Sequence, residues 1–311
     1  MPTDFHTPVL SGEVLHFLCN SPDGIYVDGT LGGGGHAENI LMNTSSHSTL
    51  IGFDLDPEAV AFSTARLERF GARATVAAGS YANLRDRLRE MDIERISGLL
   101  LDLGVSSRQI DRDERGFSFQ RDGRLDMRMD TTQSLTAWDV VNSYGEQRLA
   151  ELIRDYGEER SARRIARAVT RSRSRRPIDT TGELAGVIAA AAGDRMLTKT
   201  LARVFQAIRI EVNNELGNLR RALTDVVGML QEGGRIVVIS YHSLEDRLVK
   251  QFFRAEAARM EAPATKLLPA RPRTPLLDIL TPRPVVAGDE EVRANPRARS
   301  AKLRAAERTA L

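Results

Sequence analysis

The chain has 311 residues, of which 41% are hydrophobic and 28% are charged, and this composition is typical of a soluble globular protein with one large or two ordinary domains. The sequence contains no run of 18 apolar residues that would predict a membrane span. Its first residues do not resemble a secretory signal peptide, and we expect a cytoplasmic protein. The single cysteine, Cys19, excludes an internal disulfide and a cysteine-based zinc site, whereas a net charge of only +2 says little about partners.

The first strong pattern in chain order is the stretch YVDGTLGGGGH, residues 26–36. The apolar residues before Asp28 predict a short strand that ends there, and a helix is expected after the glycines. Glycines let the backbone N–H groups and the positive end of that helix approach a nucleotide-like ligand closely. Gly32, Gly34 and Ala37 match the dinucleotide pattern G-x-G-x-x-G/A. A flexible turn between a strand and a helix would have the same glycine pattern, so residues further along the chain must distinguish the two interpretations.

The next segments repeat this strand-and-helix alternation. TLIGFD predicts a second strand ending at Asp54, about 20 residues after the glycines, where nucleotide-binding sheets place the carboxylate that accepts the ribose hydroxyls. Residues 74–78 predict a third strand, followed by Tyr81, and residues 96–101 predict a fourth, followed by Asp102. Acids at the ends of strands one, two and four predict a doubly wound parallel sheet with a ligand crevice along those ends.

The alternation stops at about residue 107 and returns after residue 203. We therefore predict an all-helical domain over 107–203, inserted into one discontinuous domain made of residues 1–106 and 204–311. No acid occurs between Arg160 and Arg176, a segment that holds eight arginines: Arg160, Arg163, Arg164, Arg167, Arg171, Arg173, Arg175 and Arg176. A solvated helix face is the ordinary explanation of a charge run. Nucleic acid fits this one better, because each arginine on a phosphate backbone releases counterions.

The last part of the chain predicts a long helix over 201–230 and a strand over 233–240. His242 follows that strand at the edge where the ligand is expected, which makes it a candidate functional residue, although a lone histidine is usually structural. No second histidine lies at metal-ligand spacing, so no metal site is predicted. The basic tail at 295–304 either keeps the protein soluble, pairs at the sheet edge or touches nucleic acid.

Several motifs together resemble one family, the bacterial ribosomal RNA small subunit methyltransferase H family. They occur in order over nearly the whole chain: DGTLGGGGH at 28–36, DLGVSS at 102–107, RGFSF at 115–119, LDMRMD at 125–130, YGEER at 156–160, FQAIRIEVNNEL at 205–216, SYHSLEDR at 240–247 and NPRARSAKLR at 295–304. The resemblance implies an α/β fold, a class I (Rossmann-like) S-adenosylmethionine-dependent methyltransferase sheet with an inserted all-helical domain. It also implies methyl transfer from S-adenosylmethionine to N4 of a cytidine in the decoding region of 16S ribosomal RNA, and we expect the RNA to be the substrate within the small ribosomal subunit.

The resemblance also implies site residues, carried over by motif position. The S-adenosylmethionine site would hold Gly34, Gly35, His36, Asp54, Tyr81, Asp102 and Gln109. Tyr81 stands where the family often has phenylalanine, and a stacking ring is retained. Our hypothesis for catalysis is that Asp102 and the adjacent carbonyls orient N4 or the cofactor amine, with His242 as a second candidate that accepts the proton.

For RNA recognition we expect contributions from the insertion: Arg160, Arg163, Arg164 and Arg167. Trp138, the only tryptophan, is either a core residue of the insertion or a platform on which a base stacks. An apolar helix face of the insertion offers an interface for a homodimer.

Two other functions share part of these patterns. An NAD-dependent oxidoreductase would also have the glycine loop and Asp54, but it needs neither the acid after strand four nor the arginine-rich insertion. A non-catalytic RNA-binding or ribosome assembly factor would use the basic surface and leave the acidic crevice unexplained. Titration with S-adenosylmethionine and NAD separates the three.

Overall fold

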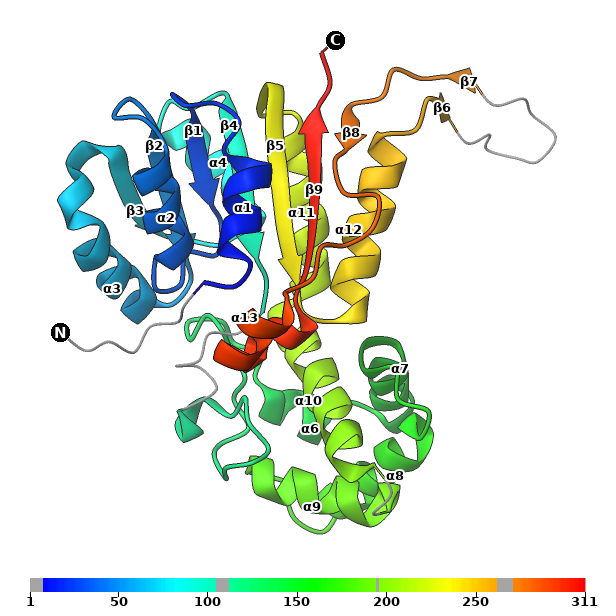
Figure 1. Ribbon diagram of the computed structural model, residues 1–311. Coiled ribbons are helices and arrows are strands. Elements are labelled where there is room, and N and C mark those ends of the chain that lie inside the picture. The colour runs from blue at the N-terminus through cyan, green and yellow to red at the C-terminus, as the bar shows by residue number, and fades with distance from the viewer. Residues whose placement is uncertain (1–7, 105–111, 194–195, 262–270, 311) are drawn as a thin grey trace. The chain divides into compact units, whose positions relative to one another are not determined.

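The structure is a computed structural model that describes residues 8–104, 112–193, 196–261 and 271–310 (Figure 1). It divides into two compact units. The first unit comprises Met1–Gly104 and Leu216–Leu311, and the second comprises Val105–Glu215. The second unit corresponds to the predicted insertion, but its far boundary follows residue 215 and not residue 203. The predicted boundary falls inside a helix that belongs wholly to the second unit.

A seven-stranded sheet organises the first unit, in the order β3-β2-β1-β4-β5-β9-β8. Its strands are β1 (Ile25–Asp28), β2 (Thr49–Asp54), β3 (Ala74–Ala78), β4 (Ile96–Asp102), β5 (Leu230–Ser240), β8 (Leu277–Ile279) and β9 (Lys302–Arg308). The strands from β3 to β5 pair in parallel, and β9 pairs antiparallel with both of its neighbours. The four predicted βα strands are therefore confirmed. A separate two-stranded sheet pairs β6 (Met260–Glu261) with β7 (Arg271–Pro272).

Helices cover both faces of the sheet, as Figure 1 shows. One face packs on α4 (Leu84–Glu90), α11 (Glu215–Val227) and α12 (Ser243–Glu256), and the other packs on α1 (Ser11–Leu18), α2 (Gly35–Asn43) and α3 (Pro57–Leu67). Along β5 successive side chains alternate between the two cores, with Ile236 and Val238 in the first and Val237 and Ile239 in the second. Burial on both faces explains why the parallel strands are continuous apolar runs in the sequence.

The helix that follows β2, α3, begins with a capping carboxylate and a proline. Asp56 accepts the Glu58 N–H at 3.0 Å and Pro57 occupies the first turn, the positions that suit a capping carboxylate and a residue without an N–H. The α-helix ends at Leu67, and a 3-10 segment, η1 (Glu68–Arg73), follows it.

The basic tail enters the sheet instead of remaining free. Its last part forms β9 between β5 and β8, so of the three alternatives for the tail the structure has the pairing with the sheet. Arg304 on β9 is only 6% exposed, and its Nε donates to Oδ1 of Asp246 on α12 at 2.6 Å. This arginine belongs to the interior of the first unit.

The second unit is built from helices: α6 (Ala137–Ser143), α7 (Glu146–Gly157), α8 (Ala162–Arg173), α9 (Thr181–Ala192) and α10 (Leu197–Asn213), with the short η3 (Asp113–Arg115) before them. Their apolar faces share one core, which includes Leu149, Ile153, Ile165, Ile188 and Ile208. The predicted all-helical character is confirmed for the described residues. In the described part of the chain, no helix is both long and apolar enough to cross a lipid bilayer.

The prediction of a single helix over 201–230 is wrong, because two helices, α10 and α11, occupy this region. Asn214 has a φ of 48°, a left-handed conformation that ends α10 before α11 begins. The preceding residue is held by contacts that are distant in sequence. The Asn213 side chain accepts the Met129 N–H at 2.7 Å and donates to the Met127 carbonyl at 2.8 Å. Helical periodicity continues through this position, so the sequence pattern alone does not reveal the break.

Candidate active site

Three acids meet at the carboxyl edge of the sheet. Asp28, Asp54 and Asp102 are the last residues of β1, β2 and β4, which are neighbours in the order β2-β1-β4. In the register of the strands, Asp28 lies opposite Leu100 of β4 and Gly52 of β2. The predicted gathering of strand-end acids is therefore present, and it makes this edge the candidate ligand site of the first unit.

The glycine loop between β1 and α2 uses conformations that favour glycine. Gly32 and Gly34 have φ values of 50° and 72°, and Gly34 is the residue immediately before α2. A Cβ on Gly34 would lie 3.2 Å from the Cβ of Ser63, so a side chain there would be strained and crowded. From α3, Arg66 Nη1 donates to the Gly33 carbonyl at 3.1 Å. The loop is thus a fixed backbone cradle at the start of a helix, which suits a ligand that approaches the chain closely.

Asp54 is tied to the same loop. Its Oδ2 accepts the Gly32 N–H and its Oδ1 accepts the Asp56 N–H, both at 2.8 Å. Burial raises the pKa of Asp54 above its ordinary value, and hydrogen bonds from the backbone N–H groups of Asp56, Gly32 and Leu55 act in the opposite direction. A carboxylate has about four lone-pair sites, so these backbone contacts do not exhaust its capacity to accept from the hydroxyls of a ribose. Its assignment to the ribose stays a prediction.

Asp28 lies beneath the loop and is 1% exposed. Its Oδ1 accepts from the backbone N–H of Thr30 at 3.0 Å and from the Thr30 hydroxyl at 3.4 Å, and that hydroxyl oxygen accepts the Asp102 N–H at 2.6 Å. Burial raises the pKa of Asp28 to about 6, against the opposing effect of His36 and with a smaller contribution from the nearby acids. The predicted site set omits Asp28, although its position at a strand end before the glycines marked it.

Asp102 is held between an aromatic hydroxyl and a histidine. The Tyr241 hydroxyl donates to Asp102 Oδ1 at 2.7 Å, and His36 Nε2 lies 3.6 Å from Asp102 Oδ2. His36 is 6% exposed, and among the residues that the structure describes neither of its ring nitrogens has a hydrogen-bond partner. Burial, followed by the charge of Asp102 and their hydrogen bond, raises the pKa of Tyr241 far above its ordinary value, so the hydroxyl stays a donor.

Tyr241 is a site residue that the sequence prediction missed. It lies in the motif SYHSLEDR, immediately after β5, and β5 is the parallel neighbour of β4. That adjacency was the available signal, since parallel neighbours end at the same edge of a sheet.

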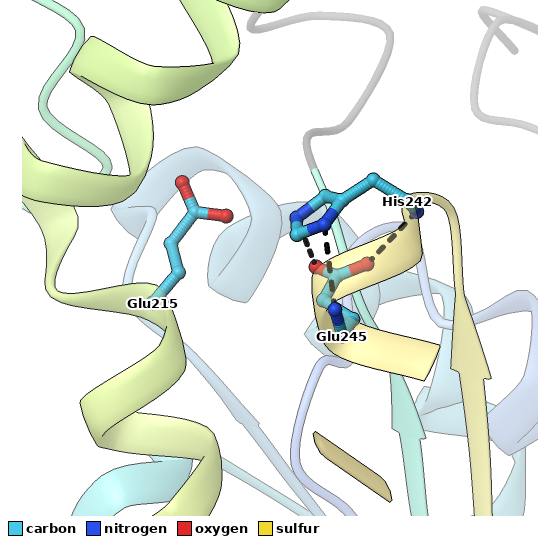
Figure 2. Close-up of side chains that lie close together, drawn as sticks. All are labelled: Glu215, His242 and Glu245. Carbon is cyan, nitrogen blue, oxygen red and sulfur yellow. Dashed lines mark hydrogen bonds and ion pairs between the residues drawn. The ribbon is translucent and has the colours of Figure 1, made fainter. Parts of the chain in front are cut away.

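His242 lies beside this tyrosine but caps α12. Its Nδ1 accepts the Glu245 N–H at 3.4 Å, and Glu245 Oε2 accepts the His242 N–H at 3.3 Å, a reciprocal capping box. Its Nε2 is 3.2 Å from Glu245 Oε1, and Figure 2 shows this pair with its dashed contacts. Glu215, also drawn in Figure 2, belongs to the other unit, where Arg209 Nε donates to it at 2.8 Å. Both ring nitrogens of His242 thus face Glu245, and its role as a proton acceptor stays a prediction.

The other predicted cofactor residues are placed as follows. Tyr81 begins the short η2 (Tyr81–Asn83) just after β3, and its Cβ would be 3.0 Å from a Cβ added to Gly29 in the loop. Gly35 is the first residue of α2. Gln109 lies outside the described residues.

In the second unit the predicted RNA-contacting arginines are all exposed: Arg160, Arg163, Arg164 and Arg167. Within the described ranges, the first two form no ion pair, whereas Arg167 Nε is 3.5 Å from Glu146 Oε1. Arg164 Nη2 donates to the Ala192 carbonyl at 3.1 Å. Acids from neighbouring helices therefore offset part of a charge run that contains no acid in its own sequence.

One arginine of the same run has a structural role. Arg173 at the end of α8 is half-buried and donates to the carbonyls of Val141 and Tyr144, at the end of α6. Cations at helix carbonyl termini are stabilising, so this side chain joins two helices of the second unit.

Trp138 is not in the core of the second unit. It is 40% exposed, and its Nε1–H donates to Asp179 Oδ1 at 2.9 Å. Of its two predicted positions the buried one is therefore wrong. Base stacking on Trp138 stays a prediction. Its ring is exposed, and the hydrogen bond to Asp179 fixes its orientation.

The edge of the first unit fits the nucleoside cofactor that the sequence predicts. The glycine cradle gives backbone contact, and the strand-end acids suit a ligand that carries positive charge. The two buried nitrogens of His36 have no hydrogen-bond partner within the part of the chain that the structure describes. Tyr81 adds an aromatic ring at the same edge. These features together describe a site for a ligand with a nucleoside part and a cationic part. The expectation that no metal takes part stays a prediction.

Comparison with known proteins gives one consistent result. The sequence pattern of the MraW methylase family matches residues 3–309. A protein of Geobacter sulfurreducens named ribosomal RNA small subunit methyltransferase H is 49% identical over 306 residues, 97% of this chain and 98% of the relative. The protein of the same name from Geotalea uraniireducens is 48% identical over 311 residues, 98% of this chain and 99% of the relative.

Solved structures add less. An rRNA methylase from Streptococcus thermophilus aligns with 96% of this chain, and the chain covers 94% of it, at 10% identity and a TM-score of 0.43. A likeness at that level is too weak to bear on the assignment.

Proposed function

Because this chain belongs to the MraW methylase family, we infer that it is an S-adenosylmethionine-dependent methyltransferase that modifies N4 of a cytidine in 16S ribosomal RNA. The observation that carries this function is the family match over residues 3–309. S-adenosylmethionine, when bound, supplies a methyl group activated by the positive sulfur. NAD-dependent hydride transfer and RNA binding without catalysis, the two other functions weighed from the sequence, do not fit membership of a methylase family.

We propose that the loop and the strand ends of the first unit hold the cofactor. Gly34, Gly35 and His36 form its cradle, Asp54 accepts the ribose hydroxyls, and Tyr81 lies against the adenine. The arrangement of these side chains at one sheet edge supports this assignment. Asp102 and Gln109 complete the proposed set.

The chemical difficulty of the reaction lies in its nucleophile. The lone pair of cytosine N4 is shared with the ring, and the cationic product must lose a proton, whereas the displacement itself mainly needs alignment of the reacting atoms. An acceptor for the N4 hydrogens therefore helps the reaction. We propose that Asp102 supplies this acceptor, since one of its oxygens is engaged by Tyr241 and the other lies 3.6 Å from a histidine that has no hydrogen-bond partner among the described residues.

Asp102→Asn tests this role. We expect turnover at saturating S-adenosylmethionine to fall roughly 100-fold, because an amide accepts hydrogens weakly and cannot take up a proton. Single-turnover methylation rates measure the effect, and Asp278→Asn, a change of an exposed acid on β8, is the matched control. Full turnover by the Asp102 variant would contradict the proposal.

We further propose that the second unit recognises the RNA. The target cytidine would lie in the decoding region, the substrate would be the RNA within the small ribosomal subunit, and the reaction would take place in the cytoplasm. The exposed arginines before and on α8 and the exposed ring of Trp138 support this assignment. The pairing of two copies of the chain stays a prediction, which light scattering of the purified protein tests.

Two arginines without ion pairs in the described chain give a specific prediction for RNA binding. Arg160→Gln and Arg163→Gln should each weaken binding and lower the slope of log affinity against log salt by about 1, because each removes one phosphate contact. Filter binding at several salt concentrations measures the slope. Arg154→Gln, on α7 and paired with Asp155 at 2.8 Å, is the control and should leave the slope unchanged. If the unmodified protein and all three variants have equal slopes, the proposal that Arg160 and Arg163 contact the RNA is wrong.

The decisive test of the function is methylation with labelled cofactor. Purified protein is incubated with radiolabelled S-adenosylmethionine and small ribosomal subunits from cells that lack the enzyme, and the labelled nucleoside is identified after digestion. We expect label on N4 of cytidine. Binding of S-adenosylmethionine without label in any small-subunit RNA or assembly intermediate would overturn the proposed substrate.

A further inference from the structure

We propose that Tyr241 is a positioning residue, whose hydroxyl fixes the Asp102 carboxylate so that Oδ2 remains available to the cofactor and to the target amine. The proposal rests on the proposed function only for the identity of the ligand. Its structural basis is a three-residue row at the sheet edge, in which Tyr241, Asp102 and His36 come from the ends of β5 and β4 and from the start of α2.

The Asp102 carboxylate needs such a partner, because rotation about its terminal bond is soft and its two oxygens are chemically equivalent. The backbone of this residue is already fixed, since its N–H donates to the Thr30 hydroxyl at 2.6 Å. The Tyr241 hydroxyl then engages Oδ1 at 2.7 Å, and hydrogen bonds to an ionised acceptor are among the stronger ones in proteins. Oδ1 thereby takes the structural role, and Oδ2 stays available to the ligand.

On the other side of the carboxylate, the described residues place a histidine near Oδ2 without a hydrogen bond between them. His36 Nε2 lies 3.6 Å from Oδ2, which is longer than a hydrogen bond, and the ring is buried without a partner in the described part of the chain. A buried polar group without a partner is costly, so this pair of atoms is suited to be satisfied by the polar group of a ligand.

Tyr241 itself is well placed to impose this orientation. Its own N–H donates to Glu245 Oε2 at 2.9 Å, which ties its backbone to the first turn of α12. Its ring lies over Gly104, where an added Cβ would be 3.3 Å from the ring. The tyrosine is therefore held at both ends, by Glu245 through its backbone and by Asp102 through its hydroxyl.

The test is a double-mutant cycle that removes the hydroxyl with Tyr241→Phe and the carboxylate with Asp102→Asn. Calorimetric titration of the full chain gives the dissociation constants for S-adenosylmethionine and for S-adenosylhomocysteine. We expect Tyr241→Phe to weaken S-adenosylmethionine binding about 10-fold, the effect of one hydrogen bond to a charged group. In the Asp102→Asn background the same change should have less than about a 2-fold effect, because the tyrosine acts through the carboxylate.

Tyr26→Phe is the matched control. Tyr26 is a fully buried tyrosine of β1 whose hydroxyl donates to the Ser21 carbonyl, so its loss removes a comparable buried hydrogen bond from the same unit. We expect this variant to lose thermal stability while its affinity for S-adenosylmethionine stays that of the unmodified protein.

Two results would overturn the proposal. One is an unchanged affinity in Tyr241→Phe, and the other is a double variant in which the two effects multiply, as they do for independent residues. The cycle needs no RNA, so its failure is distinct from failure of the proposed function. An unmodified chain that binds S-adenosylmethionine but methylates no RNA would refute the substrate and leave the role of Tyr241 measurable.

Discussion

At the scale of single residues, the sheet edge brings three carboxyl groups together, and one of them is buried from water. Asp28 is the most buried of the three strand-end acids, and its only protein donors in the described contacts come from Thr30. Burying a carboxylate disfavours its charged form, which is why its pKa rises to about 6. The site thus holds an acid whose charged form costs stability at neutral pH.

The pKa of Asp28 gives a prediction for stability against pH. The group rises from an ordinary 3.8 to about 6 in the folded state, so between pH 4 and 6 the folded state binds more protons and stability falls as pH rises. Two pKa units correspond to about 3 kcal/mol at pH 7. Part of this difference is already lost at pH 4.5, which lies above the ordinary pKa, so between pH 4.5 and pH 7 Asp28→Asn should lose about 2 kcal/mol less stability than the unmodified protein.

Calorimetric unfolding at the two pH values measures this difference. Asp278→Asn, with its exposed carboxyl on β8, controls for the loss of one acid. If Asp28→Asn and the control show the same change with pH as the unmodified protein, Asp28 is not the titrating group.

At the scale of elements, the junction of β5 and α12 both contributes a residue to the candidate active site and caps a helix. Tyr241 turns toward Asp102, and His242 turns toward the helix that it caps. Glu245 serves both residues, because its Oε2 accepts the backbone N–H of each. The helix start is therefore coupled to the candidate active site, and loss of the cap would disturb the tyrosine.

The capping role of His242 predicts different outcomes for two substitutions. His242→Ala removes the side-chain acceptor of the capping box and should cost about 1 kcal/mol of unfolding free energy. His242→Asn keeps an acceptor suited to this position, and we expect it to retain both stability and turnover. Thermal unfolding and methylation rates measure the two effects. An asparagine variant that is stable but inactive would show instead that His242 takes part in the chemistry, as the sequence suggested.

At the scale of the whole molecule, the two units differ in how they are made from the chain. The second unit is continuous in sequence, and its core is formed by its own helices. The first unit needs segments from both ends of the chain, because β5, β9 and α11 complete the cores that β1 to β4 begin. The insertion can therefore fold as a local unit, whereas the sheet depends on contacts that are distant in sequence.

This difference predicts the behaviour of fragments. Residues 105–215 expressed alone should show a cooperative thermal transition, because every member of their core is present. Residues 1–104 alone should not, because the fully buried face of β4 would lose β5 and α11. Circular dichroism during heating distinguishes the two. A gradual, non-cooperative melt of fragment 105–215 would contradict the proposal that the insertion is a domain.

Much of the fold was predictable because its signals are local. The strands β1 to β4 are apolar runs that end in acids or glycine, and capping residues such as Asp56 mark helix starts within a few positions. The break at Asn214 and the use of Lys302–Arg308 as an inner strand were not fixed by such signals. Each depends on partners far away in sequence: Met127 and Met129 for the first, β5 and β8 for the second.

The class of protein, the order of the strands along the chain and the residue types of the candidate site follow from the amino-acid sequence, because glycines, strand-end acids and family motifs are local signals. The tertiary structure alone decided how those residues are used. It joined Tyr241 to Asp102 and buried Asp28 beneath the loop. It also left Trp138 exposed and placed Arg304 in an interior ion pair. Hydrogen bonding and burial depend on which strands become neighbours, and that pairing is a property of the folded chain.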